Sequence, residues 1–400
     1  MLSAPRSFLQ PAIRQASFDD QTVQFMSRSG FPRWDEVSVA AQLLARSFKP
    51  FPPSQTNLGK TLLLGCGHGA LGIGLALRYP KEQFWLSDQN YIATKMIFET
   101  IRLNTLDNTR LIENGFPGTE YDNSFSSVLI EIPKGRKLCR RWLMKAHACL
   151  ESSGQLYVAG ANQEGIQSII QDTESLFGNV KLLSYRKGNR VARATKISNV
   201  AFSLPAWAYE PGIALGTWYE FTANIDQMSL TFRTLPGIFS YDGIDEGTRL
   251  LLSVLEITPL DRVLDFGCGY GVIGLFASKK GASRVDMIDV DLMAVACAHE
   301  NIHRNNLSGV HILAGDGIEA IGDQQYSLII SNPPFHTGRE VDYQISEMFI
   351  HQSRQALVPG GRLVIVANRF IRYDQLMQKV FPKVSILMKT SKYHVISGSN

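Results

Sequence analysis

The sequence has few cysteines and none of the cysteine spacings that hold metals or disulfide frameworks. Its five cysteines in 400 residues form no CxxC or Cys/His pattern, so neither zinc nor another metal is expected. Long apolar runs are also missing, since no stretch reaches the length of a membrane-spanning helix and the first residues lack the apolar core of a secretory signal. These absences predict a cytoplasmic protein with reduced thiols and no membrane partner.

A strong charge bias is missing as well. The net charge is +4 and the pI is about 8.7, which suits an RNA partner but not a strongly basic structural nucleic-acid protein. Hydrophobic residues make up 44% of the chain, enough to bury two cores. The length therefore predicts two domains of ordinary size.

Glycines are plentiful and gather at one point of the second half. Residues 261–271, DRVLDFGCGYG, predict a strand and a tight loop, and the apolar stretch that follows predicts a helix. The glycines let the backbone pass close to a ligand. Dinucleotide-binding proteins use a similar turn for a pyrophosphate, but an acid before the glycines better suits a cofactor that carries an amino acid. The candidate cofactor-binding residues of this loop are Asp265, Gly267, Gly269 and Gly271.

Two further acids end the next two predicted strands. Asp289 lies at about the distance where α/β nucleotide folds place a carboxylate on ribose hydroxyls, and Asp291 competes for that role. Asp316 follows the apolar run 310–313 and is a candidate for contacting an adenine amino group. Each acid alone fits an ordinary structural role, so the prediction depends on their order along the chain.

The fourth predicted strand ends in the tetrapeptide Asn332-Pro333-Pro334-Phe335. A planar amino group is a poor nucleophile because its lone pair is delocalised. The Asn332 oxygen and the Pro333 carbonyl could accept its two hydrogens in directions fixed by the paired prolines, while Phe335 stacks on the ring. Asn-Pro-Pro can also simply end a strand. Because it follows three acids in order, the series predicts a methyltransferase that uses S-adenosylmethionine.

Residues from about 234 onward resemble the bacterial ribosomal RNA guanine-N2 methyltransferases of the RsmC/RlmG type. The matching stretches include 235–240, 243–252, the glycine loop, 330–336, 360–368 and 392–395. The resemblance implies that ribosomal RNA or a ribosomal subunit is the partner and that small-subunit RNA is methylated at guanine N2. It also implies cofactor contacts by Asp245, Gly247, Thr248 and Asn332, and a guanine site at Asn332, Pro333, Pro334 and Phe335.

Three alternatives stay open at this point. Adenine-N6 and protein-glutamine-N5 methyltransferases use similar tetrapeptides that commonly end in Tyr, so Phe335 favours guanine. Outside the enzymes, the chain could be a cofactor-binding RNA assembly factor without turnover. The intact tetrapeptide argues against that reading.

The first half of the chain repeats the glycine loop. Gly65, Gly67, Gly69 and Gly72 match Gly267, Gly269, Gly271 and Gly274 at a constant offset, which indicates a duplicated fold. The copy has lost its chemistry. Leu63 stands where Asp265 stands, and in Glu131-Ile132-Pro133-Lys134 the asparagine, the first proline and the aromatic ring of the tetrapeptide are replaced. The first copy is therefore expected to be non-catalytic.

The motifs together predict an α/β fold. We expect two tandem Rossmann-like class I methyltransferase domains, each a doubly wound, mostly parallel sheet with helices on both faces. The expected parts are a flexible lead-in over 1–20, a degenerate domain over 21–200, a linker over 201–236 and a catalytic domain over 237–400. A monomer is expected.

A run of cations after Pro133 is a candidate RNA-binding element. If this segment is helical, Lys137, Arg141 and Lys145 share one face and Arg140 lies beside them. Together with Lys134, such a stripe would attract phosphates. An ordinary solvated amphipathic helix is the alternative.

Overall fold

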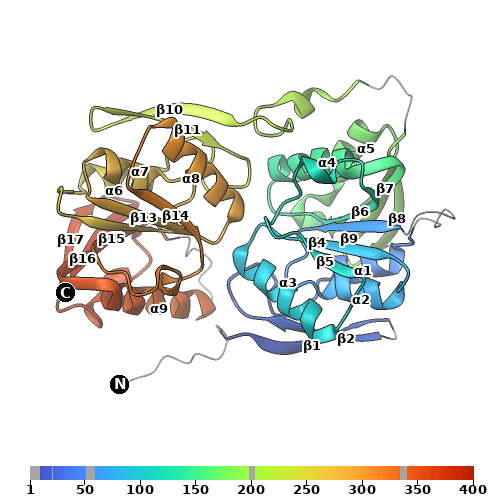
Figure 1. The fold of residues 1–400 in the computed structure, drawn as a ribbon, viewed down its shortest axis with the longest axis horizontal. Coiled ribbons are helices and arrows are strands. Elements are labelled where there is room, and N and C mark those ends of the chain that lie inside the picture. The colour runs from blue at the N-terminus through green and yellow to red at the C-terminus, as the bar shows by residue number, and fades with distance from the viewer. Residues whose placement is uncertain (1–9, 20, 51–58, 198–202, 334–339) are drawn as a thin grey trace. The chain divides into compact units, whose positions relative to one another are not determined.

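The structure is a computed structural model that describes residues 10–19, 21–50, 59–197, 203–333 and 340–400. The chain divides into two compact units, and the boundary lies between Trp218 and Tyr219. In each unit, helices cover both faces of a seven-stranded sheet (Figure 1). The predicted fold class is therefore confirmed.

The first unit begins with a hairpin and continues with alternating helices and strands. Its strands are β1 (Ala12–Phe18), β2 (Gln21–Ser27), β3 (Lys60–Leu64), β4 (Gln83–Ser87), β5 (Thr109–Leu111), β6 (Phe125–Glu131), β7 (Leu150–Ala161), β8 (Lys181–Arg186) and β9 (Asn189–Thr195). Its α-helices are α1 (Val39–Ser47), α2 (Ala70–Arg78), α3 (Tyr91–Asn104), α4 (Arg136–Cys149) and α5 (Ile166–Phe177).

The second unit repeats this order of elements. Its strands are β10 (Tyr219–Ile225), β11 (Met228–Thr234), β12 (Arg262–Phe266), β13 (Arg284–Asp289), β14 (Val310–Ala314), β15 (Tyr326–Ser331), β16 (Leu357–Asn368), β17 (Lys383–Lys389) and β18 (Tyr393–Ser399). Its α-helices are α6 (Glu246–Ser253), α7 (Val272–Lys279), α8 (Leu292–Arg304), α9 (Glu340–Ala356) and α10 (Tyr373–Gln378).

The two sheets have the same topology. The strand orders are β5-β4-β3-β6-β7-β9-β8 and β14-β13-β12-β15-β16-β18-β17. Strand β9 in the first sheet and strand β18 in the second are antiparallel to both their neighbours. All other neighbouring strands in these two sheets are parallel. In the second sheet the strand order reverses beside β12, so the carboxyl ends of β12, β13 and β15 meet at one edge. Open α/β sheets bind their ligands at such an edge.

The central strands are apolar because helices cover them on both faces. Val263, Leu264, Leu328, Ile329 and Ile330 have no exposed surface. Helix α7 is almost entirely apolar and buried, which explains why its sequence shows no polar face. This packing holds the loops at the carboxyl edge on a rigid base.

Two expected boundaries need correction. The expected linker 201–236 contains the antiparallel hairpin β10–β11, and strand β1 lies within the expected flexible lead-in 1–20. The turn of the second hairpin places Asp226 and Gln227 at positive φ, as a type I′ turn requires. Asp-Gln lacks the Asn-Gly signature of that turn, so no local pattern predicts a hairpin there.

Both hairpins are part of the duplicated unit. Each pairs two strands of seven residues, and each is bonded to the helix that follows the second parallel strand. The side-chain nitrogen of Asn104 donates to the Gln24 carbonyl at 2.9 Å, and that of Asn305 donates to the Thr231 carbonyl at 2.8 Å. The repeat therefore includes a hairpin arm in addition to the sheet.

Within the described ranges, no helix combines the length and apolar character that a bilayer span requires.

Candidate active site

The described candidate residues of the second unit gather at the carboxyl edge of its sheet. Asp265 lies one residue before the end of β12, Asp289 ends β13, and Asp316 follows β14. Asn332 follows β15, the neighbour of β12 on the other side. These residues, which follow one another at the ends of successive strands, therefore form a row of polar groups along one edge of the sheet.

The glycine loop presents open backbone at this edge. Gly267 and Gly269 have φ of +71° and +55°, a region that favours glycine. A methyl group added to either α-carbon would meet no described atom within 4 Å. The loop therefore leaves free space on the side where these side chains would stand, as a cradle for a ligand does.

Asp289 holds the glycine loop in place. Its Oδ2 accepts from the Gly269 amide at 2.7 Å, and its Oδ1 accepts from the Asp291 amide at 2.9 Å. Asp291 caps α8 by accepting from the Met293 amide at 2.8 Å. Of the two competing acids, Asp289 is thus the one bonded to the glycine loop.

Asp265 is the most unusual acid of the row because its side chain is fully buried. Its Oδ2 accepts from the Gly274 amide at 2.8 Å, while its Oδ1 has no hydrogen-bond partner among the described residues. Burial, reinforced by the negative charge of Asp289, raises the pKa of Asp265 to about 7. A buried acceptor beside an open glycine loop fits a cofactor that carries a protonated amine.

Asn332 is fixed by two side chains from the start of α6. Its Nδ2 donates to the Thr248 hydroxyl at 2.8 Å and to Asp245 Oδ2 at 3.1 Å. Because these bonds occupy the amide nitrogen, they assign the amide orientation and leave Oδ1 to accept from another group. Asp245 also caps α6 by accepting from the Thr248 amide at 3.1 Å. Asp245 and Thr248, expected over the cofactor, thus contact the expected catalytic residue.

Gly247 allows this arrangement. A methyl group at its α-carbon would lie 3.0 Å from Asp245 Oδ2 and 3.2 Å from the Tyr393 ring, tighter than ordinary contact. The sequence did not single out Tyr270, whose hydroxyl donates to the Gly243 carbonyl at 2.8 Å. This bond ties the glycine loop to the segment that enters α6.

The tetrapeptide itself is described only in part. Asn332 is half-buried and Pro333 is buried at the end of β15. Pro334 and Phe335 lie outside the described residues, so their predicted roles stay predictions.

In the first unit, the space beside the equivalent loop is filled. The ring of Trp142, from α4, stands where a side chain at Gly65 would be, since an added methyl would lie 2.2 Å from its edge. The Trp142 indole nitrogen donates to Gln89 Oε1 at 2.9 Å. Phe31 lies against Gly67, where an added methyl would be 3.6 Å from its ring. This cradle is therefore occupied by the protein's own side chains.

Glu131, which corresponds to Asn332 in the first unit, is also engaged by other side chains. Glu131 accepts from the Ser38 hydroxyl at 2.6 Å and forms an ion pair with Arg33. Ser38 caps α1 as Asp245 caps α6, so the two units share the link between a helix cap and the residue after the fourth strand. In the first unit this residue is a carboxylate that can only accept hydrogen bonds, and its Oε1 already binds Ser38 and Arg33.

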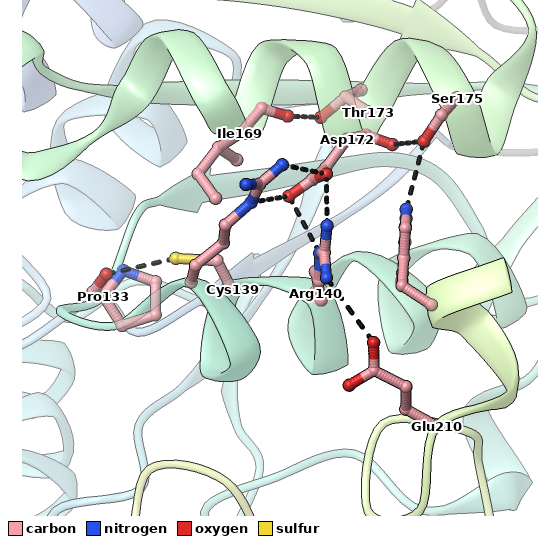
Figure 2. Close-up of polar contacts among 10 residues, drawn as sticks. Pro133, Cys139, Arg140, Ile169, Asp172, Thr173, Ser175 and Glu210 are labelled. Atoms are coloured by element: carbon pink, nitrogen blue, oxygen red, sulfur yellow. Dashed lines mark hydrogen bonds and ion pairs between the residues drawn. The ribbon is translucent and has the colours of Figure 1, made fainter. Parts of the chain in front are cut away.

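The cations of α4 are mostly engaged within the protein, which corrects part of the expected RNA-binding stripe. Arg136 and Arg140 both bind the buried carboxylate of Asp172 from α5, at 2.8 to 3.0 Å (Figure 2 shows the Arg140 contact). Arg140 also lies 3.7 Å from Glu210 and stacks over the Trp207 ring. These contacts engage the Arg140 guanidinium with residues of its own unit.

Lys145 is buried rather than presented to solvent. Its ammonium donates to the Gly118 carbonyl at 2.7 Å and to Asp122 at 2.9 Å. Helical spacing alone does not predict the burial of Lys145, because it does not show that a loop covers that face of α4. Arg141 stacks on the Phe116 ring at 5.1 Å. Of the predicted RNA-binding residues, Lys134 and Lys137 are the exposed ones.

Comparison with known proteins places the chain in a family. The family model "Methyltransferase small domain" matches residues 22–193 and again 229–397. The ribosomal RNA small subunit methyltransferase C of Pseudomonas putida W619 is 36% identical over 257 residues, covering 64% of this chain and 73% of that protein. The protein of the same name from Psychromonas ingrahamii is 32% identical, with coverages of 69% and 76%.

A solved structure has the same fold over the whole chain. The Thermus thermophilus 16S rRNA N2 methyltransferase RsmC, in complex with AdoMet and guanosine, is 23% identical, with a TM-score of 0.78 and 99% of both chains covered. This likeness supports the tandem fold. The double match to the family model agrees with the duplication predicted from the glycine loops. The chain therefore belongs to the methyltransferase small domain family, in the branch of the ribosomal RNA small subunit methyltransferases C.

Proposed function

We propose that this chain transfers a methyl group from S-adenosylmethionine to the exocyclic N2 amino group of a guanine in small-subunit ribosomal RNA. The observation that carries the proposal is the orientation of Asn332, whose amide nitrogen is held by Thr248 and Asp245. Its oxygen is thereby left to accept a hydrogen bond from an amino group. The names of the relatives and the guanosine bound to the Thermus protein support the choice of substrate.

The second unit has the residues that would hold the cofactor. Open backbone at Gly267 and Gly269, the Oδ1 of Asp265, which has no partner among the described residues, and the acids Asp289 and Asp316 lie along the carboxyl edge. When bound, S-adenosylmethionine supplies a sulfonium methyl group, whose carbon bonds to N2 while its bond to sulfur breaks and one N2 proton leaves to solvent. The filled loop of the first unit supports one cofactor site per chain.

Asn332 would act by alignment and not by proton transfer. Its oxygen accepts one N2 hydrogen and the Pro333 carbonyl accepts the other, which turns the nitrogen lone pair out of the ring plane. The same bonds strengthen as positive charge develops on the nitrogen. Because base pairing within a helix would block N2, the target guanine must be single-stranded or flipped out. Phe335 would then stack on the extruded base.

The remaining parts of the proposal concern the setting of the reaction. The first unit, with its filled cradle, would serve to hold the RNA substrate or to support the second unit. Exposed Lys134 and Lys137 are its remaining candidates for phosphate contacts. The active form would be a cytoplasmic monomer.

Nucleoside analysis tests the reaction. Small-subunit RNA from a strain that lacks the protein should gain one N2-methylguanosine when incubated with the purified chain and S-adenosylmethionine. Formation of N6-methyladenosine would show that the target is an adenine, and formation of methylglutamine in a ribosomal protein would show that it is a glutamine. Either result would contradict guanine as the substrate. Absence of any transfer to naked RNA and to 30S particles would instead favour a non-catalytic assembly factor.

A substitution separates catalysis from cofactor binding. Asn332→Ala should abolish transfer and leave the cofactor dissociation constant largely unchanged, as measured by calorimetry. A comparable loss of cofactor affinity would show that Asn332 serves the cofactor and not the amino group.

A further inference from the structure

An exposed aromatic residue stands beside the catalytic edge and has no role in the core. Phe370 is 72% exposed and lies with Arg369 at the tip of the turn that follows β16. The turn is closed by a hydrogen bond from the Ile371 amide to the Asn368 carbonyl at 2.9 Å. Single exposed apolar residues are common on proteins, so its position decides whether Phe370 has a function.

The turn lies next to Asn332. Strands β15 and β16 are parallel neighbours, and Ser331 pairs with Ile365. Asn332 and the turn at Phe370 therefore both extend beyond the same edge of the sheet. In addition, Asn368 pairs with Tyr393 of β18.

A second set of contacts joins this region to the residues that hold Asn332. The Arg369 amide donates to the Lys392 carbonyl at 3.0 Å. The Lys392 ammonium in turn lies 2.7 Å from Glu246 at the start of α6. Thr248, which binds the Asn332 amide, is in the same first turn of that helix. The Phe370 turn thus belongs to the rim of the active site.

The rim is cationic. Arg369, Arg372, Lys389 and Lys392 are all exposed and come from the Phe370 turn and from the adjoining ends of β17 and β18. Lys392 is paired with Glu246, and the Arg369 guanidinium lies 3.3 Å from the Thr390 carbonyl. Among the described residues, Arg372 and Lys389 have no ion pair. We call these four cations and Phe370 the Phe370 rim.

A flipped guanine leaves its neighbouring nucleotides unstacked, and proteins hold such nucleotides by stacking aromatic rings on bases and placing cations on phosphates. We propose that the Phe370 rim binds the single-stranded RNA that flanks the target guanine, with Phe370 stacked on a neighbouring base and the cations on the backbone. The inference rests on the proposed function, because that function makes RNA the substrate at this edge.

Matched control residues exist at the opposite edge of the same sheet. Leu260 is 88% exposed and lies two residues before the start of β12. Lys383 is exposed and begins β17, where it pairs with Ser399 at the end of β18. Both positions are at the amino ends of the parallel strands, away from Asn332.

The test measures binding of a fluorescein-labelled, ten-nucleotide single-stranded RNA that contains one guanine, by fluorescence anisotropy with the full chain. Phe370→Ala should weaken binding about 5-fold to 150-fold, the range for one lost stacking contact. Phe370→Trp should restore it, and Leu260→Ala should leave it unchanged. Equal affinities for Phe370→Ala and Leu260→Ala would overturn the proposal.

The cations have a separate signature. The double variant Arg369→Gln, Arg372→Gln should lower the slope of log Kd against log salt by about 1.4, because each phosphate contact on single strands contributes about 0.7. Lys383→Gln should leave the slope unchanged. An unchanged slope for the double variant would overturn the phosphate contacts.

Methyl transfer to small-subunit RNA distinguishes the two proposals. If the wild type methylates RNA and Phe370→Ala keeps the wild-type KM for RNA, the Phe370 rim is refuted and the proposed function stands. If the oligonucleotide results are as expected but no RNA is methylated, the rim is supported and the function fails. A loss of activity only on 30S particles, with naked-RNA binding intact, would indicate a ribosomal protein as the partner and would also refute the RNA contact.

Discussion

The side-chain nitrogen of Asn332 donates a hydrogen bond to the hydroxyl of Thr248 at 2.8 Å. This bond, with the one to Asp245, fixes which end of the amide faces the space above the sheet edge. An amide free to rotate would present its donor end to the substrate amino group for part of the time, and two donors repel. The start of α6 therefore determines whether Asn332 can accept.

The first prediction concerns Thr248. Thr248→Val keeps the shape of the side chain but removes the acceptor for the Asn332 amide. The loss of one hydrogen bond of this kind costs about 1 kcal/mol, so kcat should fall roughly fivefold. The cofactor dissociation constant should stay within about twofold of the wild-type value. Single-turnover methylation and calorimetry measure the two quantities.

Thr248→Ser is the control, because it retains the hydroxyl and should retain most of kcat. If Thr248→Val weakens cofactor binding as much as it lowers kcat, then Thr248 acts on the cofactor, as the sequence resemblance implied. The helix cap is preserved in both variants, since the acceptor for the Thr248 amide is Asp245.

The second prediction concerns the number of cofactor sites. Calorimetry should give one S-adenosylmethionine per chain, because Trp142 fills the loop of the first unit. Gly269→Val should abolish binding by filling the open loop. Gly67→Val, the same change in the first unit, should leave cofactor affinity unchanged.

Both glycines have positive φ, so each substitution also strains the backbone and is expected to lower the melting temperature. This makes the pair a matched control for strain. A stoichiometry of two, or a loss of cofactor affinity in Gly67→Val, would contradict the assignment of the first unit as non-binding.

The sequence was sufficient to predict the fold class and the row of candidate residues, because both depend on local patterns. Apolar runs that end in glycines or acids mark parallel strands and their carboxyl ends, and parallel pairing then brings Asp265, Asp289 and Asn332 to one edge. The duplicated loop also needed only a repeated spacing of glycines. These features can be predicted without knowing which helix covers which strand.

The parts that the sequence did not reveal depend on tertiary contacts. Lys145 is predicted to be exposed from helical spacing alone, yet the loop that carries Gly118 and Asp122 covers it. The filling of the first glycine loop by Trp142 depends on a residue from α4, a different element. No local pattern encodes either contact. The bond between Asn332 and Thr248 likewise joins residues far apart in the chain.

The third prediction uses the buried carboxyl of Asp265. Burial, with a further contribution from Asp289, raises the pKa of this group in the folded state to about 7, above its ordinary value near 4. Between these values the folded state holds a proton that the unfolded state has lost. The stability of the free protein should therefore fall as pH rises from about 4 to about 7.

Asp265→Asn removes this titration while keeping an acceptor for the Gly274 amide. Its free energy of unfolding should exceed the wild-type value increasingly from pH 4 to pH 7, by at most about 4 kcal/mol at the upper end. Urea denaturation without cofactor, at pH 5, 6, 7 and 8, measures the difference. A difference that does not grow with pH would show that Asp265 is ionised at neutral pH in the folded chain.

The fourth prediction separates structural cations from candidate RNA contacts on α4. Arg140→Gln and Lys145→Gln should lower the free energy of unfolding by about 1 to 3 kcal/mol each, because each removes charged hydrogen bonds to a buried or half-buried acceptor. Their affinity for the labelled oligonucleotide should match that of the wild type. Lys134→Gln with Lys137→Gln should leave stability within about 0.5 kcal/mol, since both side chains are exposed.

The stabilisation by Arg140 should depend on pH, because its hydrogen-bond acceptor, Asp172, is a titratable carboxylate. Burial acts to raise the pKa of Asp172, but the hydrogen bonds from Arg136 and Arg140 outweigh it and hold the pKa below its ordinary value. The stabilisation is therefore fully present above about pH 4 and is lost as pH falls through the lower folded-state pKa. Asp172→Asn should be less stable than the wild type at pH 7, and the gap should narrow in acid. If Arg140→Gln instead weakens RNA binding at unchanged stability, the original RNA-binding role of that residue would be restored.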